Sequence, residues 1–309
     1  MRICSLLPSA TEIVCALGMG KSLVGISHEC DYPSDIAELP KVTWSNIPQG
    51  LSSGGIDAAV GSALAEAKSL YGLDVARLER LAPTLILTQR LCQVCAVSDS
   101  EVERALSTLT CKPELLYLEP HSLDDILLTI EQVAAALGCH DRGTRLLARL
   151  RSRMAAIRRA SEHLGKPRVV CLEWVDPPFC GGHWMQELVE WAGGEDALAH
   201  RHRPSYRISW DKVLEYRPHV IVLTCCGYAL PRCLAEGRVL LRMPNACELP
   251  AVRDRRVFAT DGSAYFSRPG PRIVESLEIL AHLIHPERFA PPPLRDSWAR
   301  VDLQQAALQ

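Results

Sequence analysis

Three reactive side chains stand next to one another in SHECDYP, directly after the apolar run LVGI. They are His28, Glu29 and Cys30. Imidazole, carboxylate and thiolate groups can hold a metal ion or contact a polar ligand, although the same residue types also occur in hydrogen-bonded turns. LVGI is typical of a buried strand, and ligands of α/β proteins bind at the carboxyl ends of parallel strands. The segment is therefore a candidate binding loop.

A C-x-x-C pair, Cys92 and Cys95, follows TLILTQ, an apolar run that ends in Gln89. Such a pair can chelate zinc or cobalt, can form the redox centre of a thiol-based enzyme, or can be two thiols that pack in a loop. A structural tetrahedral site needs a second pair at matching spacing, which the other cysteines do not supply. If a metal ion binds directly, Cys92 and Cys95 are the expected ligands.

The second half of the chain repeats this design in CLEWVDPPFCGGHW. The run RVVCLEW predicts a strand that delivers Glu173 and Trp174 into a loop rich in proline and glycine. His183 and Trp184 follow at the start of a predicted helix. A single histidine is more often a satisfied polar group than a ligand, but this one follows a strand end. Both residues are therefore candidate ligand contacts, with the indole stacked on a ring.

Aromatic side chains mark two further candidate segments. Tyr265, Phe266 and Arg268 lie in GSAYFSRPGPR, after the predicted strand RRVFAT, and Trp44 lies in KVTW. Aromatic rings beside a guanidinium suit a flat or anionic ligand. Together with the tryptophans above, they predict a largely apolar binding surface with a few polar groups.

Alternating strand and helix patterns position these loops. Strand-like and amphipathic helical runs alternate over residues 1 to about 120 and again after Pro167, which is typical of parallel α/β architecture. A stretch between them has apolar residues at three- and four-residue spacing and predicts one amphipathic helix of about 20 residues. Its apolar stripe consists of Leu146, Leu147, Leu150, Met154 and Ile157.

These patterns predict two lobes, and so does a length of 309 residues at roughly 150 residues per domain. The expected fold is α/β, with two parallel-sheet lobes joined by one long backbone helix and a ligand cleft between the lobes. We expect an N-terminal α/β lobe, a linking helix, a C-terminal α/β lobe and a Pro-rich surface tail at residues 1–138, 139–165, 166–288 and 289–309.

Composition excludes several classes of protein. Hydrophobic residues make up 48% of the chain and charged residues 23%, a balance that supplies ample core and excludes intrinsic disorder. The 34 Lys and Arg against 36 Asp and Glu leave a net charge of −2, so no nucleic-acid partner is expected. No uncharged apolar run reaches the length of about 18 residues that a bilayer requires, so no membrane span is expected.

The cysteines and the first residues both favour a reducing compartment. The count of thirteen is odd, and many of these residues lie in apolar runs, where a thiol packs as a small hydrophobic group. Only Arg2 is basic near the start, and Pro8 and Glu12 interrupt the apolar run of a signal peptide. We therefore expect a cytoplasmic protein with mostly reduced thiols.

No catalytic motif commits the chain to a reaction, since G-x-S-x-G, H-E-x-x-H and G-x-G-x-x-G after a strand are missing from the sequence. Instead, RICSLLPSATEIVCALG, the linking helix and AYFSRPGPRIVESLEIL resemble the helical-backbone class (class III) of periplasmic-type substrate-binding proteins. The resemblance covers residues 1–288. SHECDYP, LCQVCAVS, CLEWVDPP, GGHW and YFSRPGPR resemble the cobalamin-binding branch of that family, which is similar to the vitamin-B12-binding protein of the ABC importer.

The resemblance implies a non-catalytic binding protein that holds cobalamin, or a related corrinoid or metal chelate, in the cleft between its lobes. It also implies an ABC transporter or a cobalamin-handling protein as partner. The residues alone leave two alternatives open: a protein that binds or delivers a metal ion such as zinc or cobalt, and a thiol-based enzyme that uses the C-x-x-C pair. The candidate ligand contacts are His28, Glu29, Cys30, Trp44, Gln89, Glu173, Trp174, His183, Trp184, Tyr265, Phe266 and Arg268.

Overall fold

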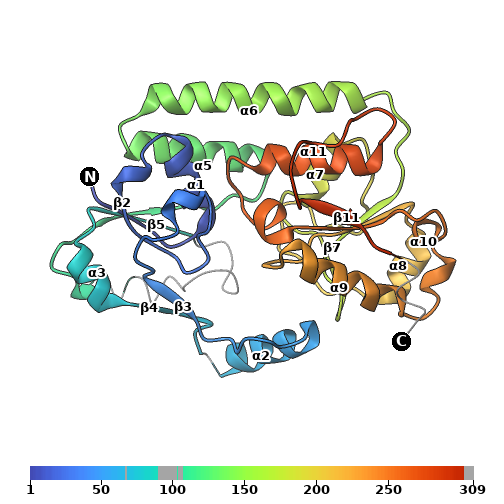
Figure 1. The fold of residues 1–309 in the computed structure, drawn as a ribbon, viewed down its shortest axis with the longest axis horizontal. Coiled ribbons are helices and arrows are strands. Elements are labelled where there is room, and N and C mark those ends of the chain that lie inside the picture. Colours follow the sequence, from blue (N-terminus) through green and yellow to red (C-terminus); the bar gives the residue numbers. More distant parts are fainter. Residues whose placement is uncertain (67, 90–102, 104–106, 303–309) are drawn as a thin grey trace. The chain divides into compact units, whose positions relative to one another are not determined.

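The chain forms two compact units, which are described one after the other (Figure 1). The structure is a computed structural model that describes residues 1–66, 68–89, 103 and 107–302. Unit 1 comprises Met1–Pro120 and Asp124–Arg149, and unit 2 comprises His121–Leu123 and Leu150–Gln309.

Unit 1 is built on a parallel sheet of four strands in the order β2-β1-β5-β6. The apolar runs that predicted buried strands form its centre, and every residue of β1 and β5 is buried. A separate antiparallel pair joins β3 to β4. The strands are β1 (Ile3–Ser5), β2 (Leu23–Ile26), β3 (Thr43–Ser45), β4 (Tyr71–Leu73), β5 (Leu85–Thr88) and β6 (Glu114–Tyr117).

The helices of unit 1 begin and end where their residues favour it. Pro8 is the first residue of α1, where its missing N–H leaves no bond unmade. Gly18, at φ +71°, ends the same helix in the left-handed conformation that glycine adopts freely. The helices are α1 (Pro8–Ala16), α2 (Ser53–Ala65), α3 (Val75–Leu81) and α5 (Leu123–Ala136), with short 3₁₀ turns at Gly20–Ser22 and Ser34–Ile36.

The long helix predicted from its apolar stripe is α6 (His140–Ser161), which has 22 residues. All five residues of the predicted stripe are buried, and the most exposed of them, Ile157, is only 8% exposed. Residues of α6 up to Arg149 belong to unit 1 and those from Leu150 to unit 2. In unit 2, Arg153 of this helix forms ion pairs with Glu275 and Glu278 at 3.1 and 2.8 Å.

Unit 2 is built on a five-stranded sheet in the order β11-β10-β9-β7-β8. Its three central strands are parallel, whereas β8 and β11 pair antiparallel at the two edges. All four residues of β9 and of β10 are buried, as expected for strands covered on both faces. The strands are β7 (Val169–Trp174), β8 (Phe179–Cys180), β9 (Val220–Leu223), β10 (Val257–Thr260) and β11 (Trp298–Arg300).

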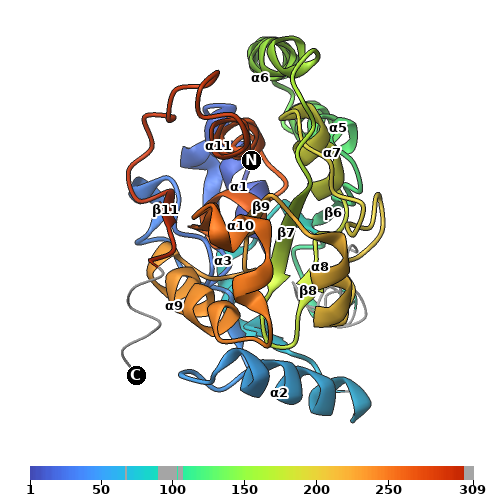
Figure 2. The same cartoon turned by 90° about the vertical axis from the view of Figure 1, so that its right-hand side faces the viewer.

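Helices pack on this sheet throughout unit 2. α7 and α11 run beside each other (Figure 2), and α9, which the sequence analysis did not predict, packs against β10 and β9. The helices are α7 (Met185–Trp191), α8 (Trp210–Tyr216), α9 (Leu230–Leu241), α10 (Pro250–Arg253) and α11 (Ile273–Ile284), with a 3₁₀ turn at Ala246–Glu248 and a π-helical turn at Gly262–Phe266.

The C-terminal segment corrects one expectation. A Pro-rich surface tail was expected from residue 289, but Trp298–Arg300 forms the edge strand β11, paired with β10. Val301 is 3% exposed and lies against Gly237, where an added methyl group would be only 2.6 Å from its side chain. The prolines precede a short strand, and Val301, directly after that strand, packs into the core of unit 2.

Candidate ligand-binding loops

In unit 1, the loop after β2 is fixed by Thr43. The chain that enters β3 pairs with the end of β2, which brings this threonine to the loop. Its Oγ1 accepts a hydrogen bond from His28 N–H at 3.0 Å, lies 2.7 Å from His28 Nδ1 and donates to Ser27 Oγ at 3.2 Å. Burial lowers the pKa of His28, so its imidazole is neutral at neutral pH. His28 is thus held in place by Thr43, with its ring beside that of Tyr71, 5.7 Å away between centroids.

Trp44, in β3, is an exposed indole held in one orientation. It is 49% exposed, yet its Nε1–H donates to Asn46 Oδ1 at 3.0 Å, and Asn46 Nδ2–H donates to Ser69 O at 3.0 Å. Gly72 faces it in β4, where an added methyl group would lie 2.2 Å from two ring carbons. The indole therefore lies directly on the backbone of β4 and presents its other face outward.

The other predicted contacts of unit 1 lie in different surroundings. Glu29 is exposed. Cys30 is 2% exposed, and its Sγ lies 3.1 Å from the hydroxyl of Thr11. Gln89, directly after β5, is 7% exposed. Of these three, only Glu29 is accessible to a ligand without a rearrangement.

In unit 2, the loops after three adjacent parallel strands meet at Tyr228. β7 ends in Trp174, whose ring centroid lies 4.9 Å from that of Tyr228, in the loop after β9. The guanidinium of Arg232 lies 3.7 Å from the Tyr228 ring centroid and donates to its hydroxyl at 2.7 Å. After β10, Ser263 N–H donates to Tyr228 O at 3.1 Å. These contacts hold Trp174 against the loops that follow the carboxyl ends of β7, β9 and β10.

The turn after β10 is in direct backbone contact with the loop after β9. An added methyl group at Gly262 would lie 2.2 Å from Cys225 O, so only glycine fits there. Tyr265, on the same turn, is partly buried, and the guanidinium of Arg272 lies 5.3 Å from its ring centroid. Tyr265 keeps a partly accessible ring that a cation–π contact orients.

Phe266 and Arg268, predicted as ligand contacts, are only 3% and 5% exposed. Arg268 Nη2 lies 3.3 Å from Ser263 Oγ, within the loop itself. Their burial assigns both side chains to the support of the turn, because a buried ring and a buried guanidinium cannot face a ligand in this conformation.

Glu173, also predicted as a contact, links β7 to the segment before α7. Its Oε1 accepts a hydrogen bond from Gly182 N–H at 2.8 Å. Burial raises the pKa of Glu173, and this hydrogen bond opposes the shift. An added methyl group at Gly182 would lie 2.2 Å from Ser205 N, so three chain segments converge here. The carboxylate holds the loop together.

His183 and Trp184 stack on each other, with ring centroids 5.6 Å apart and planes 25° apart. His183 adopts a left-handed backbone conformation, at φ +49°, and burial lowers its pKa to about 4. Trp184 is only 6% exposed, so its ring is not available to stack on a ligand, contrary to expectation. His183 Nδ1 and Trp184 Nε1 are both buried and make no hydrogen bond within the structure. The two rings therefore bury polar nitrogen atoms inside unit 2 and offer no exposed aromatic surface on which a ligand could stack.

The described part of the chain contains eleven cysteines, all of them free thiols. Burial raises the pKa of Cys4 and of Cys180 to about 12, so these thiols are protonated and unreactive. Cys92 and Cys95 lie outside the described residues. The described thiols therefore act mainly as packing groups.

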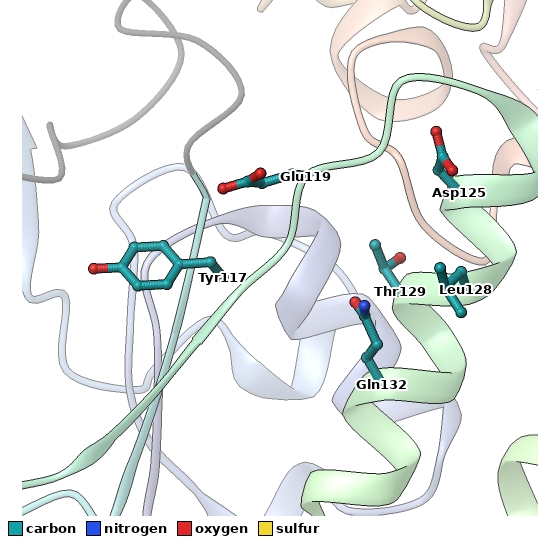
Figure 3. A pocket seen from close by; sticks show the side chains of 6 residues that line it. All are labelled: Tyr117, Glu119, Asp125, Leu128, Thr129 and Gln132. Carbon is teal, nitrogen blue, oxygen red and sulfur yellow. The ribbon is translucent and has the colours of Figure 1, made fainter.

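A pocket of about 280 Å³ lies in unit 1, between α5 and the segment that begins with β6 (Figure 3). Glu119 projects from that segment, and Asp125, Thr129 and Gln132 project from α5. A corrin or porphyrin needs a larger site, at the upper end of the usual range of about 300–1,000 Å³. The pocket is too small and too polar for such a ligand.

Two exclusions concern the described residues. Among residues 1–66, 68–89, 103 and 107–302, no three His, Cys, Asp or Glu side chains are grouped so that they could hold a metal ion. Over the same ranges, none of the helices combines the length and the apolar character that crossing a bilayer requires.

Sequence reasoning missed several residues that build these loops. Gly72 and Asn46 fix Trp44, and Tyr228 and Arg232 connect the loops of unit 2. Tyr228 does follow an apolar run, as the predicted contacts do, but the partners are brought together by the fold and not by spacing in the sequence.

The chain matches the family model described as "Periplasmic binding protein" over residues 3–264. It is 23% identical over 285 residues to a vitamin B12-binding protein of Vibrio parahaemolyticus, a match that covers 91% of this chain and 88% of that protein. It is 22% identical to an uncharacterized ABC transporter substrate-binding lipoprotein of Bacillus subtilis, with 93% and 81% covered.

Solved structures of similar fold are periplasmic binding proteins. The vitamin B12 binding protein of Vibrio cholerae is 23% identical, with a TM-score of 0.68 over 92% of this chain and 96% of that chain. The heme-binding protein of Roseiflexus sp. RS-1 is 25% identical, with a TM-score of 0.68 over 92% and 98%. Both are periplasmic proteins, and the helical-backbone fold expected from the sequence is confirmed.

These findings contradict the expected cytoplasmic location, because the matching family is described as periplasmic and the similar proteins are periplasmic or lipoproteins. They also settle the question of catalysis. Periplasmic binding proteins bind a solute and do not transform it, so the chain is a binding protein and not an enzyme. The match over residues 3–264 covers most of the chain, which belongs to the periplasmic binding protein family.

Proposed function

We propose that the protein binds cobalamin or a closely related corrinoid. The curated relatives include a vitamin B12-binding protein, and a relative of solved structure binds heme, another flat tetrapyrrole around a metal. Both ligands have a broad planar ring system on which aromatic side chains can stack. The ligand class is therefore a tetrapyrrole-type metal chelate, and the corrinoid is our choice within it.

The observation that carries the proposal is the indole of Trp44. An aromatic side chain that is 49% exposed normally rotates, but this one is fixed by Asn46 and by contact with Gly72. A surface already held in its binding orientation loses little conformational entropy when a ligand stacks on it. Trp44 therefore suits the flat face of a macrocycle.

Charge favours a corrinoid over a haem in unit 1. Glu29 and Asp31 are exposed carboxylates beside His28 in the loop after β2, and together they outnumber the ammonium of Lys41, which donates to Cys30 O at 2.7 Å. A haem carries two propionate groups, which these carboxylates would repel. A corrin carries neutral carboxamides around its edge, whose N–H groups can donate to carboxylate oxygens.

In unit 2, we assign the ligand-facing role to Trp174 and Tyr265. Each ring is partly exposed and each is oriented by a neighbour, Tyr228 in one case and Arg272 in the other. Glu173, Phe266, Arg268 and Trp184 support the loops from behind in this assignment. His183 is proposed as an edge contact, since its neutral ring can accept or donate one hydrogen bond.

We further propose that the protein works outside the cytoplasmic membrane and delivers its ligand to the membrane subunits of an ABC importer. A curated relative is an ABC transporter substrate-binding lipoprotein, which supports this type of partner. Direct binding of zinc or cobalt ions is the alternative, and its expected ligands, Cys92 and Cys95, lie outside the described residues.

Calorimetric titration of the purified protein tests the proposal. We expect cyanocobalamin to bind with a Kd of about 1 µM or tighter, roughly −8 kcal/mol, and haemin to bind at least tenfold more weakly. Zinc and cobalt chlorides serve as the comparison for a metal-ion protein. Tighter binding of haemin would replace the corrinoid by a porphyrin, and stoichiometric metal binding without either macrocycle would overturn the ligand class.

A further inference from the structure

The long helix α6 carries more positive charge than its packing requires. Residues 142–161 contain seven arginines and no aspartate or glutamate, although the whole chain has a net charge of −2. Three of these arginines have partners within the protein: Arg142 donates to the carbonyls that follow α1, Arg153 pairs with two glutamates of α11, and Arg158 lies over an indole of α7. The fold therefore uses fewer than half of the seven.

The other four arginines define what we call the basic face of α6. They are Arg145, Arg149, Arg151 and Arg159. All four are exposed, and within the described residues none of them forms a hydrogen bond or an ion pair. The nearest acidic residues along the chain, Asp141 and Glu162, lie just outside the arginine-rich stretch at its two ends. The charge of the basic face is therefore not neutralised by the protein itself.

The spacing of these groups is set by helix geometry alone, because α6 is one uninterrupted helix. About 21 Å of helix separates Arg145 from Arg159. Alanine and serine occupy most of the other exposed positions between them, so the guanidinium groups are the longest side chains on this side of the helix. A guanidinium pairs well with a phosphate group, and an extended row of them suits an extended array of phosphates better than one small anion.

We propose that the basic face of α6 binds the phosphate groups of an anionic phospholipid membrane. This inference goes beyond the proposed function and takes from it only the place of work, beside the membrane subunits of an importer. A bilayer surface presents phosphates in a flat, closely spaced array, and arginines near such a surface are attracted to it. Since the basic face has no large apolar side chain to insert, the contact is electrostatic and sensitive to salt.

The test measures co-sedimentation of the full chain with vesicles of phosphatidylglycerol and phosphatidylethanolamine, and with vesicles of phosphatidylcholine alone. Arg145→Gln/Arg149→Gln removes two charges from the basic face. Arg238→Gln/Arg242→Gln is the matched control, because it removes the same charge from exposed positions at the end of α9. Cyanocobalamin calorimetry follows ligand binding in each variant, and fluorescence anisotropy with duplex DNA tests a second kind of phosphate array.

We expect the wild type to bind the phosphatidylglycerol vesicles, to ignore phosphatidylcholine, and to be released by about 0.5 M salt. The α6 variant should bind about 25-fold more weakly, a factor of about five for each arginine, while the control binds like the wild type and both keep their cyanocobalamin affinity.

Three results would overturn the proposal: no binding of the wild type to phosphatidylglycerol vesicles, an equal loss in the α6 variant and the control, or tighter binding to duplex DNA than to vesicles. A wild type that binds the vesicles through α6 but binds no tetrapyrrole would support the lipid contact and overturn the proposed ligand, so the two failures are distinguishable.

Discussion

One aromatic side chain of unit 1 and two of unit 2 lie at strand ends in opposite surroundings. In unit 1, Trp44 is 49% exposed and is held from behind by a glycine and an asparagine. In unit 2, Tyr228 and Trp184 are only 4% and 6% exposed and serve as the centre of loop packing. An aromatic residue near a strand end can thus be either a contact for a ligand or a support for the loop, and burial distinguishes the two.

Two glycines, one in each unit, show a similar difference in what they contact. Gly262, in unit 2, contacts the backbone carbonyl of Cys225, which cannot move without the loop. Gly72, in unit 1, contacts the indole of Trp44, a side chain whose displacement breaks its hydrogen bond to Asn46 but does not require the backbone to move. The same substitution, glycine to alanine, should therefore lower stability in one unit and ligand affinity in the other.

The largest effect is expected for Gly262→Ala. Its methyl group would have to displace the loop after β9, so we expect the free energy of unfolding to fall by about 3 kcal/mol. Urea denaturation followed by circular dichroism measures this loss. Gly165→Ala is the matched control, because an added methyl group there meets nothing within 4 Å. Equal stability of the two variants would show that the loops of unit 2 are not the rigid frame described above.

A smaller effect concerns His183. Burial lowers its pKa in the folded protein to about 4, below the value of about 6.5 in an unfolded chain. The unfolded chain therefore binds the extra proton between about pH 6.5 and 4, so stability is fully present above pH 6.5 and falls as the pH drops through this window.

His183→Asn removes the titrating group, and asparagine tolerates the left-handed backbone. Because His183 is partly exposed, we expect it to account for only about 1–2 kcal/mol of the acid destabilisation. The difference between wild type and variant, measured by urea denaturation from pH 7 to pH 4, isolates this contribution from that of Asp196, whose raised pKa acts in the opposite direction. A pH-independent difference would contradict the assignment.

The smallest effect is expected for Gly72→Ala. The methyl group would push the indole of Trp44 off the backbone of β4, and we expect cyanocobalamin affinity to fall about fivefold, roughly 1 kcal/mol. Stability should change by less than about 1 kcal/mol, since moving the half-exposed ring breaks its hydrogen bond to Asn46 but displaces no backbone. A variant that unfolds as readily as Gly262→Ala would remove the distinction between the two units.

The elements of the fold were predictable because they depend on local patterns. The apolar stripe from Leu146 to Ile157 predicted α6, and buried runs such as TLILTQ predicted central strands. The edge strand β11 was missed, since the prolines before it indicate a loop, and its pairing with β10 depends on a partner about 40 residues away.

The roles of individual site residues were harder to predict, because burial is set by the tertiary structure. From the sequence, Trp184 and Trp44 look equally suited to stacking on a ligand. In the structure, Trp184 follows the left-handed backbone of His183 and its indole is buried, whereas the indole of Trp44 is exposed. Asn46 and Gly72 carry no sequence signal at all, since their effect depends on the pairing of β3 with β4.

The cysteines show how a compositional argument failed. A high thiol count suggested a reducing compartment, yet the family is described as periplasmic. Cys4, Cys171, Cys180, Cys225 and Cys233 are 0% exposed. Thiols that are buried in a folded core cannot reach another thiol to form a disulfide. The number of cysteines therefore says less about the compartment of a protein than the exposure of their side chains does.

The central claim is that unit 1 presents a prearranged aromatic face to a corrinoid, and the most direct test is calorimetric titration of Trp44→Ala with cyanocobalamin. Trp210→Phe, in α8, is the control for loss of a partly exposed indole elsewhere. We predict that Trp44→Ala weakens binding by about 2 kcal/mol, roughly thirtyfold, while Trp210→Phe binds like the wild type. Wild-type affinity in Trp44→Ala would contradict the account.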